Sequence, residues 1–578
     1  MDGFYNKLLR VNLTQRKTTV EAIPDEVTAR YLGGKGLGAY LLMKYAPAGV
    51  HPLAPENPLI IVTGPATDSG LAPASRYMVF AKSPQTGFFG EAASGGHTPP
   101  QIRATGYDAI ILEGATPEPI FLEISDEGVK YHDASPYWGM DSYESEAVLE
   151  DAVGVKGAKA FVIGPAGENL VVFSGIHNDH GRHAARTGMG AVMGSKKIKG
   201  IVFHGKARCK LHDQEALKAF DKELRKNSLQ SATAKFYRDL GTPGLVSMTN
   251  EVGAFPSYYW TKGTVPYWPQ ISGAALQEKY KPRSKACAMC FMACGKVTTI
   301  SEGDYAGTHV EGPEYETIYT FGGLNAVDNL PAIAYLNELC DRLGMDTISA
   351  GNLTALAIEA SRLGRVNFKL EYGDTKGIAE LLREMASRTG RGEILSKGIK
   401  EASKILGLED IAVHVKGLEP AGYEPRALKG MGLAYAINER GADHLRATVY
   451  KPELAGVVDP QAIEGKAALV IDFEDRHTVS DTLIFCRFYR DLIGWNELPA
   501  IIHHLTGLEL DRAGIEKMSL DIANLIREFN LREGMTPADD TLPPRLLNNA
   551  LEDSGKRLTP AELQYMLDDY YTRRGWKR

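Results

Sequence analysis

The pattern of apolar and polar positions changes near residue 205 of the 578-residue chain. Up to that point, short apolar runs alternate with glycine-rich and polar turns, which is the pattern of β-strands. The polar stretch 206–214 then separates this part from the rest of the chain. The predicted strands are 7–13, 59–64, 77–83, 109–114, 120–125, 160–164, 170–175 and 200–205.

Beyond this stretch the apolar residues recur with a period close to 3.6, which predicts helices. Segment 511–530 is the clearest case, because Ile515, Met518, Ile522, Leu525, Ile526 and Phe529 form one apolar stripe that predicts a buried helix face. Strands followed by helices indicate an α+β protein. We predict a β-rich domain at 1–210 and two mostly α-helical domains at 211–415 and 416–578. The other predicted helices are 214–240, 329–364, 376–407 and 497–506.

Charge and hydropathy exclude several classes of protein. Lys plus Arg number 65 against 72 Asp plus Glu, a net charge of −7, so we expect no nucleic-acid partner. No apolar stretch approaches the roughly 18 residues of a membrane span, and the first residues lack a secretory pattern. We therefore expect a cytoplasmic protein without membrane insertion.

The cysteines suggest a metal centre. Cys287, Cys290 and Cys294 lie together in CAMCFMAC, and the other three are isolated. In a reducing compartment such a cluster indicates metal rather than disulfides. Three closely spaced thiolates suit an iron–sulfur cubane whose fourth ligand comes from elsewhere. Structural zinc usually takes two separated pairs, and the radical-SAM spacing runs in the opposite order. Spacing alone leaves Cys209, Cys340 and Cys486 as candidates for the fourth ligand.

Two glycine-rich segments also attract attention. RTGMGAVMGSKK at 186–197 could cradle a phosphate if it opens a helix, although tight packing explains it equally well. It matches neither a P-loop nor a dinucleotide fingerprint. For GGKGLG at 33–38 we prefer the simpler interpretation of tight packing or turns.

Ordered blocks along the whole chain resemble one family. They include KLLRVNLT, APENPLIIVTGP, ASRYMVFAKSPQTGF, SGGHTPPQIRATGYDAIILEG, GAVMGSKKIKGI, CAMCFMACGKV, EGPEYET, LCDRLGMDTIS, GLAYAINERGADHLRA and YYTRRGW. In these blocks the sequence resembles the tungsten-dependent aldehyde ferredoxin oxidoreductases. The resemblance implies a tungsten (or molybdenum) bis-pterin close to one [4Fe–4S] cluster. The N-terminal domain would form a saddle for the cofactor, and the two helical domains would close over it.

The resemblance also assigns residues to these groups. It makes Cys486, at the end of DTLIFC, the fourth cluster ligand beside the three clustered cysteines, and leaves Cys340 as a buried apolar thiol. The backbone of Ala93 could ligate an Mg²⁺ ion that bridges the pterin phosphates. The expected cofactor-binding residues are Arg76, Ala93, Gly95, Gly96, Arg186, Thr187, Gly188, Asp341, Asp346, Thr347, Arg446, Asp481 and Phe485.

The sequence departs from the family pattern at three places. Ala93 replaces a common asparagine, HTPP at 97–100 replaces an aromatic-Phe-Gly sequence, and Ile484 replaces the usual glycine of the second pterin motif. We expect the prolines to stiffen their loop. The helix after Asn329 has no convincing E-x-x-H motif, so the resemblance does not lead us to predict the intersubunit iron site of some family members.

The resemblance places the catalytic groups on Glu316 of EGPEYET and His444 of RGADHLRA. A carboxylate buried there would have a raised pKa and could take a proton near neutral pH. We expect oxidation of an aldehyde to its acid, with electrons leaving to ferredoxin or a partner iron–sulfur subunit, and the chain could be part of a homo- or hetero-oligomer. The alternatives are a low-potential reductase of aromatic acyl-CoA thioesters and a non-catalytic electron-transfer subunit.

Overall fold

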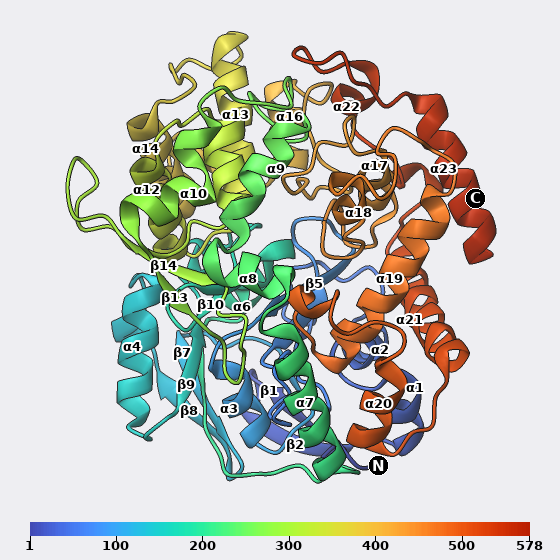
Figure 1. The fold of residues 1–578 in the computed structure, drawn as a ribbon. Helices are drawn as coiled ribbons and strands as arrows, with labels where there is room; N and C mark the ends of the chain where they lie inside the picture. Colours follow the sequence, from blue (N-terminus) through green and yellow to red (C-terminus); the bar gives the residue numbers. More distant parts are fainter. Residues whose placement is uncertain (578) are drawn as a thin grey trace.

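The computed structural model describes residues 1–577 and has the predicted α+β architecture, with the strands near the N-terminus and the helices following. Two six-stranded sheets form the N-terminal part (Figure 1). The first sheet has the order β2-β1-β6-β3-β4-β5, and only β1 and β6 run parallel. Its strands are β1 (Lys7–Asn12), β2 (Lys17–Ala22), β3 (Leu59–Val62), β4 (Tyr77–Lys82), β5 (Phe89–Ser94) and β6 (Ala109–Glu113).

The second sheet has the order β11-β10-β9-β12-β7-β8, in which only β7 and β12 run parallel. Helix α4 (Ser142–Val153) packs against β9 and β12. The strands are β7 (Ile120–Ser125), β8 (Gly128–Asp133), β9 (Lys159–Val162), β10 (Ile176–Asn178), β11 (Arg182–Ala184) and β12 (Ile198–Phe203).

The alternation of side chains along β1 shows how the sheets pack. Successive residues of a strand point to opposite faces. Leu9 and Val11 belong to one core cluster with Phe161 of the second sheet, so the two sheets pack face to face. Leu8 points the other way, into a cluster with the helices α2 (Gly34–Tyr45), α20 (Leu498–Thr506) and α21 (Arg512–Arg532).

The helices after residue 205 follow the predicted pattern, with the long segments divided into several helices. The stripe on α21 is buried as predicted, except that Leu525 is only partly buried. The divided segments are α7 (Gln214–Ser228) with α8 (Ala232–Asp239), α12 (Leu330–Leu343) with α13 (Thr347–Arg362), and α14 (Thr375–Ser387) with α15 (Gly392–Leu395) and α16 (Ile399–Leu406). The C-terminal part adds α17 (Lys429–Ile437), α18 (Tyr450–Leu454), α19 (Lys466–Leu483), α22 (Pro544–Asn548) and α23 (Pro560–Arg574).

The largest core cluster draws side chains from both sides of residue 415, such as Leu356 of α13 and Leu433 of α17. The boundary predicted at this residue therefore stays a prediction. A small third sheet carries the cysteine-rich loop and consists of β13 (Arg283–Lys285), β14 (Gly295–Thr299) and β15 (His309–Glu311). Across residues 1–577, no helix combines the length and apolar character needed to traverse a bilayer.

Two local predictions need correction. Segment 170–175 is not a strand, because Val171 and Phe173 are buried in the helical core and the Phe173 carbonyl accepts a hydrogen bond from Asp346 N. Segment 97–100 is not a loop throughout, because its prolines lie in the first turn of α3 (Thr98–Ala104). The tight packing preferred for GGKGLG is present in α2, where a Cβ on Gly34 would lie 2.0 Å from the carbonyl oxygen of Asp481.

Candidate cofactor cavity and active site

A cavity of about 350 Å³ lies between the N-terminal sheets and the helices. Its wall comes from β5, the segment before α6 (Met189–Ser195), the EGPEYET segment, the start of α13, the loop 438–446 and the end of α19. These segments are far apart in sequence, so the fold alone brings them together. The predicted residues on this wall are Arg76, Ala93, Gly95, Arg186, Cys294, Glu316, Asp341, Asp346, Thr347, His444, Arg446, Asp481 and Phe485.

Three predicted cofactor-binding residues are outside this wall. Thr187 has a left-handed backbone (φ 66°) and donates a hydrogen bond to the Glu91 carbonyl at 3.1 Å. Gly188 and Gly96 allow close backbone approach, because a Cβ would lie 2.1 Å from Val172 O and 2.2 Å from Asp179 Oδ2, respectively. Of the three, Thr187 supports the wall directly, because Glu91 lines the cavity.

Cys287, Cys290, Cys294 and Cys486 line a second, smaller cavity of about 60 Å³. Their thiols are free of disulfide bonds. The fold brings Cys486 to this place by a hydrogen bond from its N–H to Pro73 O at 2.9 Å. The two cavities adjoin, because both are lined by Arg76, Gly95, Arg182, Cys294 and Phe488. The other two cysteines lie outside both walls, Cys340 buried in α12 and Cys209 in the segment before α7.

The four thiols fit a cluster better than a single ion. No group of three His, Cys, Asp or Glu side chains within residues 1–577 is close enough to hold one metal ion. Tetrahedral zinc would need its sulfur ligands about 2.3 Å from one centre. Thiols arranged around a cavity are what a cubane requires, because each iron takes one sulfur ligand.

The first pterin motif joins α12 to α13. Asp346 is the N-cap of α13, and its carboxylate accepts hydrogen bonds from the N–H groups of Ile348 and Ser349. Asp341 is 1% exposed and its carboxylate is oriented from several sides. It accepts hydrogen bonds from Asn337 Nδ2 at 2.9 Å and Tyr143 OH at 3.1 Å, and His183 Nε2 lies 3.1 Å from its other oxygen.

The second motif ends α19. Asp481 pairs with Arg446, whose Nη1 lies at 3.2 Å, and with Arg487. Ile484, which stands where the family usually has glycine, has φ 75° and is 1% exposed. A β-branched residue rarely adopts this left-handed conformation. The departure seen in the sequence therefore places backbone strain two residues before Cys486.

Buried arginines make the cavity suitable for an anionic group. Within residues 1–577, Arg182 Nε, Arg440 Nε and Arg487 Nη1 are buried without a hydrogen-bond partner. Burial also lowers the pKa of Arg487 to about 10. Arg186 is less available, because Asp346 at 3.0 Å and two backbone carbonyls accept from its terminal nitrogens. A dianionic phosphate or a negatively charged cofactor would satisfy such unpaired donors.

Lysines 196 and 197 have no part in this cavity. Lys196 Nζ donates to the carbonyls of Pro55 at 3.0 Å and Gly114 at 3.2 Å. Lys197 lies over the ring of Trp138, at 5.2 Å from its centroid. The phosphate cradle considered for 186–197 thus keeps only Arg186 on the cavity wall, because its glycines pack against neighbouring backbone and both lysines make structural contacts.

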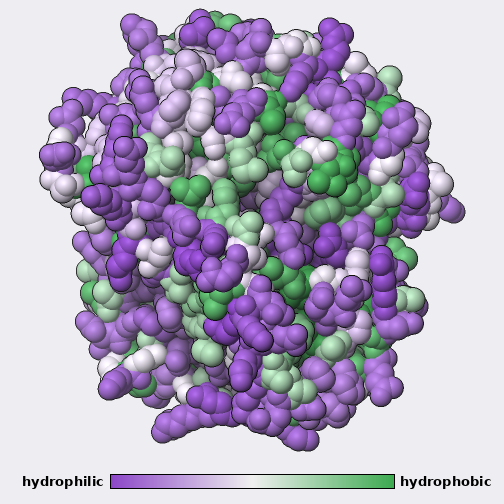
Figure 2. Space-filling view, viewed as in Figure 1, coloured by the Kyte–Doolittle hydropathy of each residue, from purple (hydrophilic) through white to green (hydrophobic). Residues whose placement is uncertain are grey.

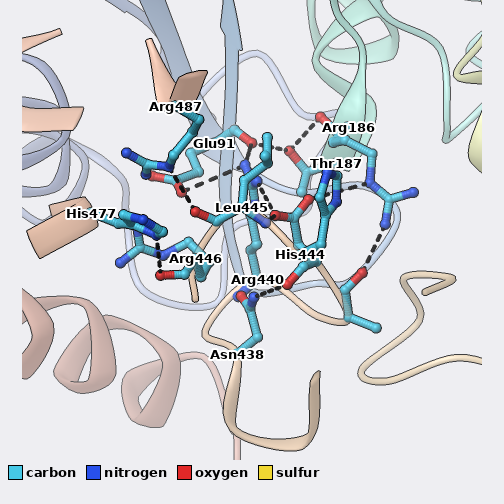
Figure 3. A network of polar contacts seen from close by, with 12 residues as sticks. Glu91, Arg186, Thr187, Asn438, Arg440, His444, Leu445, Arg446, His477 and Arg487 are labelled. Carbon is cyan, nitrogen blue, oxygen red and sulfur yellow. Dashed lines mark hydrogen bonds and ion pairs between the residues drawn. The ribbon is translucent and has the colours of Figure 1, made fainter. Parts of the chain in front are cut away.

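The loop 438–446 is the centre of a polar network (Figure 3). Arg440 donates to the carbonyl of Glu91 at 2.8 Å and pairs with Asp443 at 2.8 Å. Arg446 pairs with Glu439 at 2.6 Å and donates to Thr478 at 2.9 Å. The loop therefore ties the floor of the cavity to β5 and α19.

Sequence reasoning missed several members of this network. Lys35, in the GGKGLG segment, is 0% exposed and contacts Glu91 at 2.8 Å and Glu439 at 2.6 Å. The sequence gives one indication of Glu439, Arg440 and Asp443: the high proportion of charged residues in the NERGADHLR segment. No sequence feature indicated that Glu91 and Lys35 are buried, because isolated charged residues are usually exposed.

Glu316 and His444 are close neighbours on the cavity wall, with Glu316 Oε1 3.6 Å from His444 Nε2. Gly422 N donates to the other carboxylate oxygen at 2.8 Å. Burial raises the pKa of Glu316 to about 8 and lowers the pKa of His444 to about 4. The ring of Tyr423 lies 5.5 Å from the imidazole and backs it. At neutral pH both side chains are therefore uncharged, and the pair can hold or pass one proton.

Comparison with known proteins places this chain in a family. The model of the aldehyde ferredoxin oxidoreductase N-terminal domain matches residues 8–205, and the model of domains 2 and 3 matches residues 215–578. The tungsten-containing aldehyde ferredoxin oxidoreductases of Pyrococcus furiosus and Thermococcus kodakarensis are 35% and 34% identical, each over 100% of this chain and 97% of the relative. An aliphatic sulfonate oxidoreductase, WOR-like subunit, of Pyrococcus furiosus is 31% identical over 77% of this chain and 75% of its own.

A solved structure shares the fold. It is the active-site complex BamBC of benzoyl coenzyme A reductase with 1,5-dienoyl-CoA, and the matching chain aligns with a TM-score of 0.86 at 23% identity. The alignment covers 100% of this chain and 95% of that one. Both family models and the full-length identity to the tungsten enzymes agree with the resemblance seen in the sequence. The chain belongs to the aldehyde ferredoxin oxidoreductase family and is an oxidoreductase.

Proposed function

We propose that the protein oxidises aldehydes to carboxylic acids and passes the electrons through a [4Fe–4S] cluster to ferredoxin or a partner iron–sulfur subunit. An aldehyde and one water give a carboxylate, three protons and two electrons. The observation that carries the proposal is the Glu316–His444 pair in a cavity that adjoins four converging cysteines. The names of the full-length relatives support the same chemistry.

The residues of the two cavities fit the expected cofactors. Cys287, Cys290, Cys294 and Cys486 would hold the cluster. Tungsten or molybdenum bis-pterin would occupy the larger cavity, and when bound it supplies the two-electron chemistry at the substrate carbon. Arg76 and the unpaired arginine donors would meet the pterin phosphates, together with an Mg²⁺ near the backbone of Ala93.

The protein's own contribution is proton management. The raised pKa of Glu316 lets its Oε1 accept a proton from water near the substrate above about pH 8. His444, neutral at this pH, can orient the carbonyl by donating a hydrogen bond from a ring N–H. The aromatic ring of Tyr423 behind the imidazole excludes water and limits the positions that the ring can take.

Two measurements on anaerobically purified protein test this proposal. Elemental analysis should give about one tungsten or molybdenum and about four irons per chain. A panel of aldehydes should reduce an artificial acceptor, and Glu316→Gln should lose most turnover while keeping its metal content. Loss of tungsten together with activity in this variant would instead make Glu316 structural.

The fold similarity to the benzoyl coenzyme A reductase complex supports a second candidate, reduction of an aromatic acyl-CoA. Both reactions need a cavity with proton-transfer groups, so the geometry alone does not separate them. An assay of aldehydes and of an aromatic acyl-CoA with the same preparation separates the two reactions. Turnover of the thioester without oxidation of any aldehyde would replace the first proposal by the second.

A further inference from the structure

The cysteine-rich loop between β13 and β14 reaches the protein surface. Met289, between Cys287 and Cys290, is 59% exposed, and the four cysteines around the small cavity are each partly exposed. The loop lies beside α7 on the face shown in Figure 1. Since electron transfer weakens steeply with distance, a cluster held here would be accessible to an external acceptor on this face.

Helix α7 contacts this loop directly. Arg225 Nη2 donates to the carbonyl of Met289 at 2.6 Å, and its guanidinium lies 5.6 Å from the ring centroid of Phe291. Residues three and four apart share one helix face. Lys222, Lys226 and Leu229 therefore lie on the same side of α7 as Arg225, and all three are exposed.

The surface around the loop is basic although the whole chain carries a net charge of −7. Arg238 of α8, 33% exposed, adjoins β13, because its carbonyl accepts from Ser284, and Arg283 on that strand is exposed. The acidic neighbours are partly neutralised: Asp221 pairs with Arg225, and Asp239 lies 3.9 Å from Arg238. Glu223 is also exposed on α7.

We propose that this surface, formed by Lys222, Arg225, Lys226, Arg238, Arg283 and the exposed Met289, is the docking face for an acidic iron–sulfur electron carrier. The proposal rests on the proposed function, because it assumes a cluster behind the loop. Opposite charge steers a carrier to the face, and the apolar Met289 and Leu229 would be covered in the complex. Figure 2, seen from the same side as Figure 1, shows a mainly hydrophilic surface with scattered apolar patches, which is compatible with a transient contact.

The face is unlike a nucleic-acid site, because its positive residues surround an apolar loop rather than a stripe of aromatic side chains. The carrier would take one electron in each encounter, so two encounters complete one aldehyde oxidation. Each transfer oxidises the enzyme's cluster and reduces the carrier's cluster, with no other co-reactant.

The test is the double variant Lys222→Glu/Lys226→Glu of the holoenzyme. We expect the KM for an acidic two-cluster ferredoxin to rise roughly tenfold and its dependence on salt to weaken. The rate with benzyl viologen, a small dication, should be unchanged or higher. A matched control, Lys376→Glu/Lys397→Glu, changes the charge equally on exposed residues of α14 and the segment before α16. It should leave both rates unchanged.

Direct binding of ferredoxin, measured at low and high salt, separates failure of this proposal from failure of the proposed function. If no aldehyde is oxidised but ferredoxin still binds the unchanged protein more tightly than the double variant, the docking proposal holds although the proposed function fails. The docking proposal would be overturned if the two proteins bound ferredoxin equally or if the control variant showed an equal effect. Preferential binding of duplex DNA to this face would also overturn it.

Discussion

The ammonium group of Lys35 lies 2.8 Å from both carboxylate oxygens of Glu91, and both side chains are almost completely buried. Lys35 comes from the N-terminal turn of α2 and Glu91 from β5, so the pair fixes the helix to the sheet at the wall of the cavity. Glu439 contacts the same ammonium at 2.6 Å. Lys35 thus bridges two carboxylates, each of which has a second cation nearby: Arg440 lies 3.5 Å from Glu91, and Arg446 lies 2.6 Å from Glu439.

Removal of this cation should be costly. Lys35→Met removes both ammonium hydrogen bonds of the buried Glu91 and leaves each carboxylate with a single arginine, so we expect the free energy of unfolding to fall by about 3 kcal/mol. Denaturant unfolding measures this, with Lys44→Met, an exposed lysine of the same helix, as control and an expected change within about 0.5 kcal/mol. Equal effects of the two substitutions would show that the buried pair contributes no special stability.

The contact between Ile484 and Gly64 gives a second prediction. The left-handed backbone at Ile484 costs about 1–2 kcal/mol, but its buried side chain contributes more, since removing a large buried aliphatic group costs about 2–5 kcal/mol. Ile484→Gly should therefore destabilise the protein, by about 2 kcal/mol.

A double-mutant cycle tests the contact itself. A Cβ on Gly64 would lie 2.7 Å from Ile484 Cγ1, so Gly64→Ala alone should destabilise the protein. In the Ile484→Gly background the same alanine fills space and should cost much less, giving an interaction energy of about 1 kcal/mol or more. Additive effects would mean that the backbone shifts and removes the contact.

The sequence predicted the local parts of this structure well. The stripe from Ile515 to Phe529 lies in the core as predicted, because apolar residues at a helical period mark the buried face of a helix. The strand predicted at 170–175 is wrong because its apolar residues are buried against a helical core instead of in a sheet. A short apolar run in the sequence is compatible with either environment.

The residues of the candidate site were harder to predict from local sequence patterns. Spacing predicted Cys287, Cys290 and Cys294 as cluster ligands but left three candidates for the fourth, and only the resemblance selected Cys486. Lys35 and Glu91 were missed because their burial depends on long-range pairing, which no local pattern reports. Loop 438–446 has no periodicity, so Arg440 could be placed at the cavity only by the fold, whereas the resemblance had already predicted Arg446 there.

Substitution of the cysteines should separate cluster ligands from other thiols. Cys290→Ala removes a thiol from the small cavity, and we expect loss of most of the roughly four irons per chain. Cys340→Ala, in α12, and Cys209→Ala are matched controls that should keep full iron content. Iron analysis with electron paramagnetic resonance measures the outcome. Iron retained in Cys290→Ala, or lost in Cys340→Ala, would contradict the assignment.

The raised pKa of Glu316 predicts a pH dependence of activity. Because this pKa is about 8, the carboxylate that can accept a proton is the minor form at neutral pH. If Glu316 acts as the base, kcat/KM should rise with pH and level off above about 8, and Glu316→Gln should lose this rise. Glu314→Gln is the matched control, since this neighbour hydrogen-bonds Thr242 and the rise should persist. A rate that falls through pH 8 would make the protonated form the active one.

The same shift should be visible in stability. The pKa of Glu316 is about 8 in the folded protein against an ordinary value of 4.5, so the folded state binds more protons between these two values. The free energy of unfolding contributed by this group is therefore fully present below about pH 4.5 and is lost as the pH rises to about 8. Glu316→Gln should flatten this part of the stability curve, measured by denaturant unfolding at several pH values. An unchanged slope would mean that Glu316 is ionised in the folded protein, and the proton transfer to and from His444 would then need another donor.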